Sequence, residues 1–113
     1  MMVNMKQEPK PTIQERTLKA FLDLAILCAI TEHPMTGYEI KRLILKKHRI
    51  FLNPGTIYAK LTAMERKDWI KPTKIGARKV YELTEDGKRK TAKMEDTSRE
   101  IQAFLKNMLK CSD

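Results

Sequence analysis

The side chains best suited to chemistry in this sequence are cations, and they are concentrated in one stretch. Between Lys41 and Lys79 the sequence has 12 lysines and arginines against two acidic residues, Glu65 and Asp68, so the stretch carries +10 and the remainder carries −1. Such a concentration of charge attracts polyanions, either nucleic acid or an anionic membrane surface. The chemistry that the sequence offers first is therefore the binding of phosphate groups.

Other kinds of site lack their characteristic residues. His33 and His48 stand far apart and have no cysteine or carboxylate at the spacing of metal ligands, so no metal site is predicted. The sequence contains no glycine-rich phosphate loop, nucleophile elbow or paired carboxylate motif. We therefore expect a protein that is not an enzyme and has no cofactor.

The cysteines and the apolar runs indicate a cellular setting. Cys28 and Cys111 form no CxxC pair and no disulfide framework, which fits a reducing compartment. The longest apolar run, Leu24 to Ile30, is too short to cross a bilayer, and the N-terminus lacks the apolar region of a secretory signal. We expect one cytoplasmic domain with no membrane partner from these 113 residues.

The elements that position the cations begin with a core helix. Residues 1–11 are polar and contain two prolines, so they are predicted to form a flexible arm. Thr12 and Glu15 have the spacing of a capping box, so the first helix is expected to start near Ile13 and to run without a break to His33, which precedes a proline. This helix is apolar around much of its circumference, which is typical of a central core helix.

Two further helices carry helix-turn-helix signals. Thr36 and Glu39 form a second capping box, which predicts the start of the next helix. Asn53 is a good N-cap and Pro54 suits the first helical position, so a recognition helix is predicted over residues 54–68. Ile57 and the apolar residues one and two turns later are expected to face the core.

A basic hairpin is predicted after the recognition helix. Residues 70–83 are rich in β-branched and aromatic residues and are interrupted by Gly76. Pro72 lies within the first strand, which indicates an edge position because proline has no N–H to donate. The predicted fold class is thus mainly α with a small β-hairpin wing, a winged helix-turn-helix domain over residues 12–84.

The C-terminal region, residues 85–113, is expected to form a dimerisation helix. Thr84 can cap it, and its predicted course is continuous to about Lys110. The apolar face of this helix has no other predicted element of the chain to pack against, so we expect a second copy of the chain to cover it in a homodimer. The residues expected in the dimer contact are Phe21, Met94, Ile101, Phe104, Leu105 and Met108.

Residues 18 to 90 resemble the PadR family of transcriptional regulators. The segments that carry the resemblance are Gly37-Tyr38-Glu39, Pro54-Gly55-Thr56-Ile57-Tyr58 and Tyr81-Glu82-Leu83-Thr84-Glu85-Asp86-Gly87, in that order. The resemblance implies a dimeric winged-helix DNA-binding protein that often represses a promoter and is sometimes released by a small molecule. The chain departs from the family's usual pattern at Asn53, Ala59 and Trp69, where serine, proline and a smaller residue are common. It also has only one predicted C-terminal helix.

The residues expected to contact double-stranded DNA lie on the two helices and the wing. Small residues outside the buried face of the recognition helix allow close approach to the major groove, and cations can bind phosphates. Tyr58 is either an aromatic at the edge of the core or a phosphate ligand, and Lys41 either binds phosphate or is merely solvated. The predicted contact residues are Thr36, Lys41, Asn53, Gly55, Thr56, Tyr58, Ala59, Lys60, Thr62, Lys74, Arg78 and Lys79.

The leading hypothesis is a sequence-specific transcriptional regulator, most often a repressor in such a family, that binds a near-palindromic operator as a homodimer. Two alternatives are a winged-helix module that binds an acidic protein and an architectural protein that binds DNA without sequence preference. A small-molecule effector is a further hypothesis, with a cavity at the dimer interface, beneath Trp69, Phe21 and Phe104, as its site.

Overall fold

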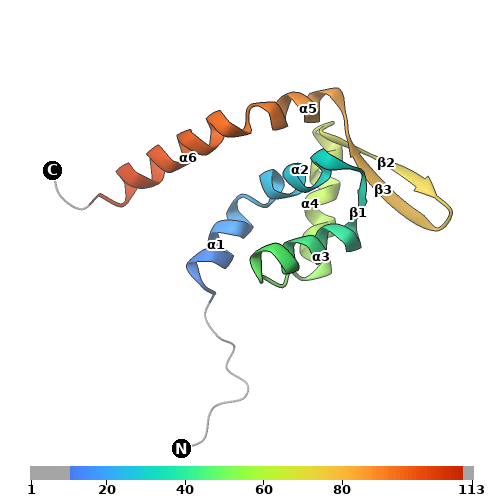
Figure 1. The fold of residues 1–113 in the computed structure, drawn as a ribbon, viewed down its shortest axis with the longest axis horizontal. Helices are drawn as coiled ribbons and strands as arrows, with labels where there is room; N and C mark the ends of the chain where they lie inside the picture. Colours follow the sequence, from blue (N-terminus) through green and yellow to red (C-terminus); the bar gives the residue numbers. More distant parts are fainter. Residues whose placement is uncertain (1–10, 111–113) are drawn as a thin grey trace, which may run out of the picture.

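The computed structural model describes residues 11–110, and every structural statement below refers to this part of the chain. It is mainly helical with one small sheet, as the sequence predicts (Figure 1). The predicted arm at residues 1–11 lies almost entirely outside the described residues. The elements in chain order are α1 (Ile13–Ala20), α2 (Leu22–Glu32), β1 (Met35–Thr36), α3 (Gly37–His48), α4 (Pro54–Arg66), β2 (Ile70–Ile75), β3 (Arg78–Leu83), α5 (Glu85–Ala92) and α6 (Met94–Met108).

The core lies between α2, α3, α4 and the sheet. Leu22, Ile26 and Leu27 supply its α2 face, and Ile57 and Leu61 supply its α4 face, all of them almost inaccessible to solvent. Burial of these aliphatic side chains is the main stabilising contribution, since each fully buried one is worth about 1.5–3 kcal/mol. The helix-turn-helix pair is thus held on a rigid base.

The helix caps form as the sequence predicts. The hydroxyl of Thr12 accepts from the Glu15 N–H, and that of Thr84 accepts from the Gly87 N–H, both at 3.0 Å. Asn53 caps α4 through its side-chain oxygen. Because each cap satisfies a backbone donor that a helix start leaves without a partner, local sequence fixes where these helices begin.

The sheet has one more strand than the predicted hairpin. Met35 and Thr36 form the two-residue β1, which pairs with β3, so the strand order is β1-β3-β2. β2 is therefore an edge strand, which confirms the position inferred from Pro72. The turn between β2 and β3 is Gly76-Ala77, and Gly76 has a φ of 64°, a left-handed value that glycine tolerates best.

Two helices that were predicted to be continuous are each broken once. The first is interrupted at Phe21 (φ −116°, ψ 31°) and the last at Lys93 (φ −92°, ψ 4°). Neither position is glycine or proline. At Phe21, α2 is fixed in the core by five buried residues while α1 has none, so packing sets the direction of α2 alone. The long helices were wrong predictions at these two points.

The wing leads directly into the C-terminal helices. The Thr84 N–H donates to the carbonyl of Trp69 at 3.0 Å, which ties the end of β3 to the residue before β2. From there α5 passes over α2, and α6 projects away from the wing (Figure 1). No helix within residues 11–110 is long and apolar enough to cross a membrane.

Candidate nucleic-acid interface

The recognition helix α4 buries one face and exposes the other. Ile57, Leu61 and Met64 are at most 1 % exposed, which confirms the predicted inward face. Small or short polar side chains are therefore left outside, and Lys60 is half-buried beside them. The predicted contact residues exposed on this helix are Gly55, Thr56, Tyr58, Ala59 and Thr62. Apart from Tyr58, these side chains are small enough to let the helix backbone approach the floor of a DNA groove.

Two of the predicted contact residues on or beside α4 use their polar atoms within the protein. The Asn53 side-chain oxygen accepts from the Gly55 N–H at 2.7 Å, which leaves its amide NH₂ to donate to a ligand. The Thr62 hydroxyl donates to the Tyr58 carbonyl at 2.9 Å. Thr56 and Lys60 are thus the better candidates for hydrogen bonds to base edges or phosphates.

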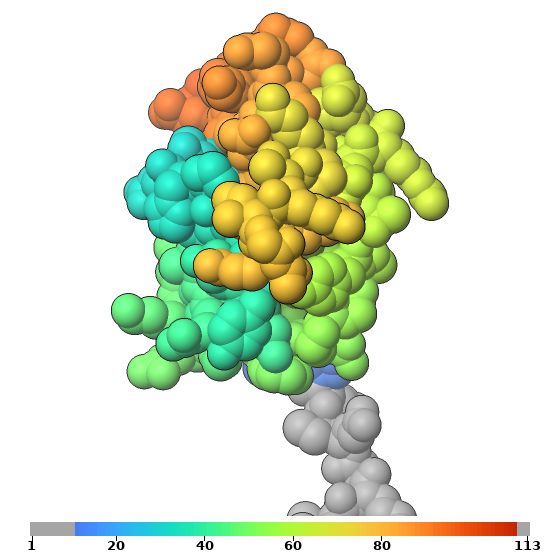
Figure 2. Space-filling model, turned by 90° about the vertical axis from the view of Figure 1, so that its right-hand side faces the viewer, coloured from blue at the N-terminus to red at the C-terminus, as the bar shows by residue number. Residues whose placement is uncertain are grey.

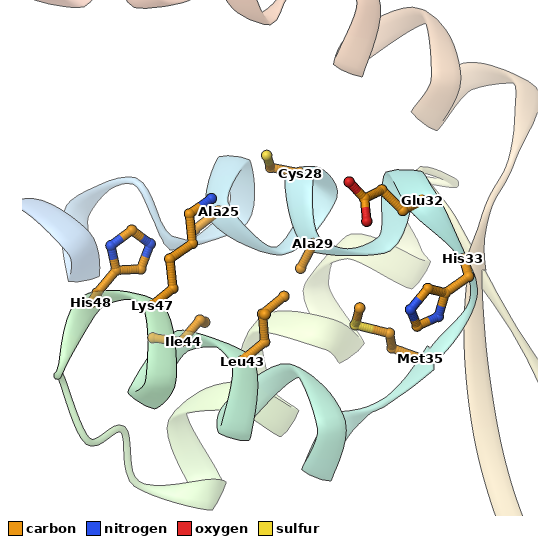
Figure 3. Close-up of a pocket in the computed structure, with 10 residues that line it drawn as sticks. All are labelled: Ala25, Cys28, Ala29, Glu32, His33, Met35, Leu43, Ile44, Lys47 and His48. Atoms are coloured by element: carbon orange, nitrogen blue, oxygen red, sulfur yellow. The ribbon is translucent and has the colours of Figure 1, made fainter.

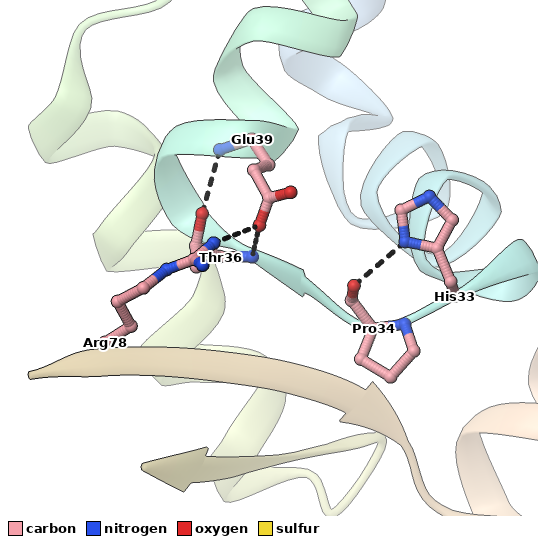
Figure 4. A network of polar contacts seen from close by, with 5 residues as sticks. All are labelled: His33, Pro34, Thr36, Glu39 and Arg78. Atoms are coloured by element: carbon pink, nitrogen blue, oxygen red, sulfur yellow. Dashed lines mark hydrogen bonds and ion pairs between the residues drawn. The ribbon is translucent and has the colours of Figure 1, made fainter. Parts of the chain in front are cut away.

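Thr36 is half-buried and belongs to the cap of α3 (Figure 4). Its hydroxyl accepts from the Glu39 N–H at 3.1 Å, and its own N–H donates to Glu39 Oε1 at 3.0 Å. The backbone and side-chain hydrogen bonds with Thr36, and then the charge of Arg78, lower the pKa of the Glu39 carboxyl. Glu39 is therefore a fixed negative charge beside the wing.

Two wing cations predicted to bind phosphate already contact carboxylates. Arg78 donates to Glu39 Oε1 at 3.1 Å, and the Lys79 ammonium lies 3.6 Å from Glu65 Oε1 on α4 (Figure 4 for Arg78). Lys74 is exposed and is the cross-strand partner of Lys79. Two like charges directly opposite each other destabilise a hairpin, so a bound anion would relieve the repulsion between them.

The side chain of Tyr81 and the carboxylate of Glu65 also affect Lys79. The two groups together raise the pKa of the Lys79 ammonium, the Tyr81 side chain having the larger effect. Lys79 therefore keeps its positive charge throughout the neutral range.

The wing lies between the helices that carry these partners. Figure 2 shows it from the wing side, with the hairpin in yellow and orange crossing in front of α4 on one side and the start of α3 below. Ion pairs join the wing to both helices, since Arg78 contacts Glu39 at the start of α3 and Lys79 contacts Glu65 on α4. Arg78 and Lys79, two of the predicted contact residues, therefore lie beside the start of α3 and the C-terminal half of α4.

Phe51 is an exposed aromatic residue that sequence reasoning did not single out. It is 63 % exposed, and the Lys41 ammonium lies 4.8 Å from the centre of its ring. A signal existed, because the apolar pair Phe51-Leu52 directly precedes α4 and only one of the two can face the core, which is Leu52 at 1 % exposed.

Tyr58 occupies an intermediate position between core and solvent. Its ring is 48 % exposed and rests on Gly37, where an added β-carbon would lie 2.7 Å from Cε1. The α3 backbone therefore acts as a platform for the ring. Tyr58 thus lies at the edge of the core, and its hydroxyl can still bind a phosphate, so both interpretations made from the sequence fit the structure.

The residues predicted for the dimer contact lie apart from this region. Phe104 and Met108 on α6 are 67 % and 57 % exposed, whereas Ile101 and Leu105 are half-buried. Met94 packs partly against the core of its own chain, which reduces the surface that it can offer to a partner. The remaining apolar face of α6 is open in the single chain.

A cavity of about 440 Å³ lies between α2 and α3 (Figure 3). Apolar residues line it from both sides, such as Ala29 on α2 and Leu43 on α3, with Glu32 near one end and Lys47 near the other. Phe21, Trp69 and Phe104, the residues of the hypothetical effector cavity, do not line it. Within residues 11–110, no group of three or more His, Cys, Asp or Glu side chains is placed to hold a metal ion.

The fold and the surface together define a class of protein. A helix pair with a short turn, an exposed small-residue face on its second helix and a cationic hairpin beside it form a winged helix-turn-helix DNA-binding unit.

Comparisons with known proteins agree with this class. The model of the "Transcriptional regulator PadR-like family" matches residues 26–93, which is more than half of the chain. The chain therefore belongs to the PadR-like family of transcriptional regulators and is not an enzyme. No curated protein sequence matches it.

Three solved structures illustrate the similarity. A PadR family transcription regulator from Clostridium difficile is 28% identical with a TM-score of 0.67, covering 80% of this chain and 99% of its own. A PadR-like transcriptional regulator from Bacillus cereus is 25% identical with a TM-score of 0.69, covering 86% and 99%. A transcriptional regulator from Clostridium thermocellum shares the fold at 20% identity, with a TM-score of 0.76 and coverage of 88% and 100%.

Proposed function

We propose that this protein is a sequence-specific transcriptional repressor that binds a near-palindromic operator as a homodimer, through α4 and the wing. The observation that carries the proposal is the outer face of α4, which is small and polar and has the cationic wing beside it. A helix that only faces solvent does not require this combination. A helix that enters a major groove between two phosphate backbones requires both small side chains and flanking cations.

Base recognition is assigned to the first half of α4. Thr56 and Lys60 lie one turn apart on the exposed side of the helix, so both can reach the same groove. A lysine can donate to the O6 and N7 acceptors of guanine, and the methyl groups of Thr56 and Ala59 can contact the methyl group of thymine. The operator half-site would then contain both a guanine and a nearby thymine.

Phosphate contacts are assigned to the flanking cations. Lys41 on α3 would bind the backbone on one side of the groove, and Lys74, Arg78 and Lys79 would bind it on the wing side. The opposition of Lys74 and Lys79 across the hairpin supports this assignment, because a phosphate between them offsets their repulsion. These contacts would position the protein without reading sequence.

Dimerisation is assigned to α6. Phe104 and Met108 expose apolar surface that a second copy can cover, and Ile101 and Leu105 lie on the same side. A two-fold dimer would place two α4 helices in successive major grooves about 34 Å apart, which requires a near-palindrome. Repression would follow where such an operator overlaps a promoter, because the bound dimer excludes the polymerase.

The experiment that tests DNA reading compares two lysine variants. Lys60→Ala removes a cation from the proposed reading face, and Lys19→Ala removes one from the exposed surface of α1. Fluorescence anisotropy with a selected duplex should show about tenfold or greater loss for Lys60→Ala, since a good base contact is worth about 1–3 kcal/mol. Equal losses for both variants would mean that α4 contributes only general charge.

A further inference from the structure

Two carboxylates hold the wing from opposite sides of β3. Arg78 contacts Glu39 at the start of α3 at 3.1 Å, and Lys79 contacts Glu65 near the end of α4 at 3.6 Å. Successive side chains of a strand point to opposite faces, so one pair lies on each side of the hairpin. Ion pairs at the start of β3 thus connect the wing to both α3 and α4.

Both carboxylates are held in place by other parts of the fold. Glu39 accepts from the Thr36 N–H in the cap of α3, and this contact keeps it ionised and oriented (Figure 4). The Glu65 side chain is only 28% exposed and follows the buried Met64. The two ion pairs are therefore formed by carboxylates whose positions are set by other contacts.

The position of these acids is unusual for a surface that binds DNA. Glu65 is the one acidic residue of α4, and it lies in a stretch that otherwise has only Asp68 against 12 cations. Each acid faces a cation that the proposed function assigns to phosphate binding. A phosphate must therefore compete with a carboxylate for Arg78 and for Lys79.

We propose that Glu39 and Glu65 keep Arg78 and Lys79 from binding the backbone of non-cognate DNA, so that these two wing cations bind phosphate only on a cognate site. This inference rests on the proposed function. On a cognate site, base contacts of α4 bring the wing against the backbone and offset the loss of the two ion pairs. On other DNA no such compensation exists, so the two cations stay with their carboxylates.

The proposal predicts how salt affects binding. Non-specific affinity depends on the number of phosphates that are neutralised, at about 0.9 units of log–log salt slope per contact. Glu39→Gln/Glu65→Gln should steepen the slope on a scrambled duplex by about 1–2 units, because both cations become available. The slope on the selected duplex should change little, since both cations already bind phosphate there.

The experiment measures the affinity of the full-length protein for a selected and a scrambled duplex over a range of salt concentrations. The matched control is Glu82→Gln/Glu85→Gln, which removes two carboxylates that contact Lys71 and Lys88 instead. We expect Glu39→Gln/Glu65→Gln to raise the affinity for the selected duplex about three- to tenfold, the scale of two exposed ion pairs, and to steepen the salt slope on the scrambled duplex alone. The control should raise both affinities equally.

Several results would overturn the proposal. An unchanged salt slope on the scrambled duplex in Glu39→Gln/Glu65→Gln, or the same steepening in the control, would mean that the acids act only through net charge. A fall in both affinities would mean that they support the wing instead. Glu65→Gln alone should give part of the effect and leaves the cap of α3 intact. If the wild-type protein failed to distinguish the two duplexes, the proposed function itself would be wrong.

Discussion

Gly87 packs directly against the backbone of Trp69. A β-carbon added to Gly87 would lie 1.9 Å from the Trp69 carbonyl oxygen, which is far inside any permitted contact. The Thr84 hydroxyl donates to the Asp68 carbonyl at 2.5 Å in the same junction. The first turn of α5 and the start of the wing are therefore one rigid joint, which fixes the direction in which the C-terminal helices leave the DNA-binding unit.

Gly87→Ala should consequently destabilise the fold by about 3 kcal/mol or more, because a backbone carbonyl cannot move aside as a side chain can. Gly76→Ala is the matched control. Gly76 has open space around it, so alanine there meets only the cost of a left-handed backbone, about 1 kcal/mol. Thermal or denaturant unfolding measures both. Equal stabilities of the two variants would contradict the close contact.

Phe51 should contribute to DNA affinity without affecting its salt dependence. An exposed aromatic beside the recognition helix can contact sugar or a thymine methyl group, and burying part of its ring is worth about 1 kcal/mol, or roughly fivefold in affinity. Phe51→Ala should lose this affinity at an unchanged salt slope. Lys41→Ala, in contrast, should reduce the slope by about 0.9 units. Full affinity in Phe51→Ala would place the ring away from DNA.

The acid stability of the protein should depend on Glu39. Its folded-state pKa is lowered from 4.5, so the unfolded chain takes up the proton first as the pH falls. The contribution of Glu39 to stability is present above about pH 4.5 and is lost as the pH drops through the lower folded-state value. The stability difference between wild type and Glu39→Gln should therefore shrink from pH 7 to pH 3 in denaturant titrations. A constant difference would contradict the assigned pKa shift.

Phe104 should be needed for self-association. Phe104→Glu places a charge in the proposed contact, whereas Gln102→Glu places the same charge two residues away, on the opposite side of α6. Sedimentation at micromolar concentration should find a dimer for wild type and Gln102→Glu and a monomer for Phe104→Glu. A monomeric wild type, or a dimeric Phe104→Glu, would remove the proposed role of α6.

The parts of the fold that could be predicted are those fixed by neighbouring residues. Thr36, Asn53 and Thr84 cap helices through residues two or three positions away, so their roles are evident in the sequence. The breaks at Phe21 and Lys93 depend on how α2 and α5 pack, and no glycine or proline marks them. The two-residue β1 is too short to show a strand periodicity.

The features of the candidate site also divide into those that follow from neighbouring residues and those that depend on contacts between distant parts of the chain. The outer face of α4 follows from the helical spacing of Ile57, Leu61 and Met64, and it was predicted from that spacing. The contact of Arg78 with Glu39 joins residues 39 positions apart, so it depends on the pairing of β1 with β3. Because that strand was not predicted, the sequence did not indicate this ion pair, and the pair of Lys79 with Glu65 depends on how the wing packs beside α4.

Selection of bound duplexes from a random pool tests the central claim most directly. If the protein reads DNA as a dimer through α4 and the wing, the selected sequences should share a near-palindrome whose half-sites lie about one helical turn apart. The motif should lose its preferred bases when Lys60→Ala replaces the wild type. A selection that returned no shared motif, or an asymmetric one, would contradict sequence-specific recognition by a two-fold dimer.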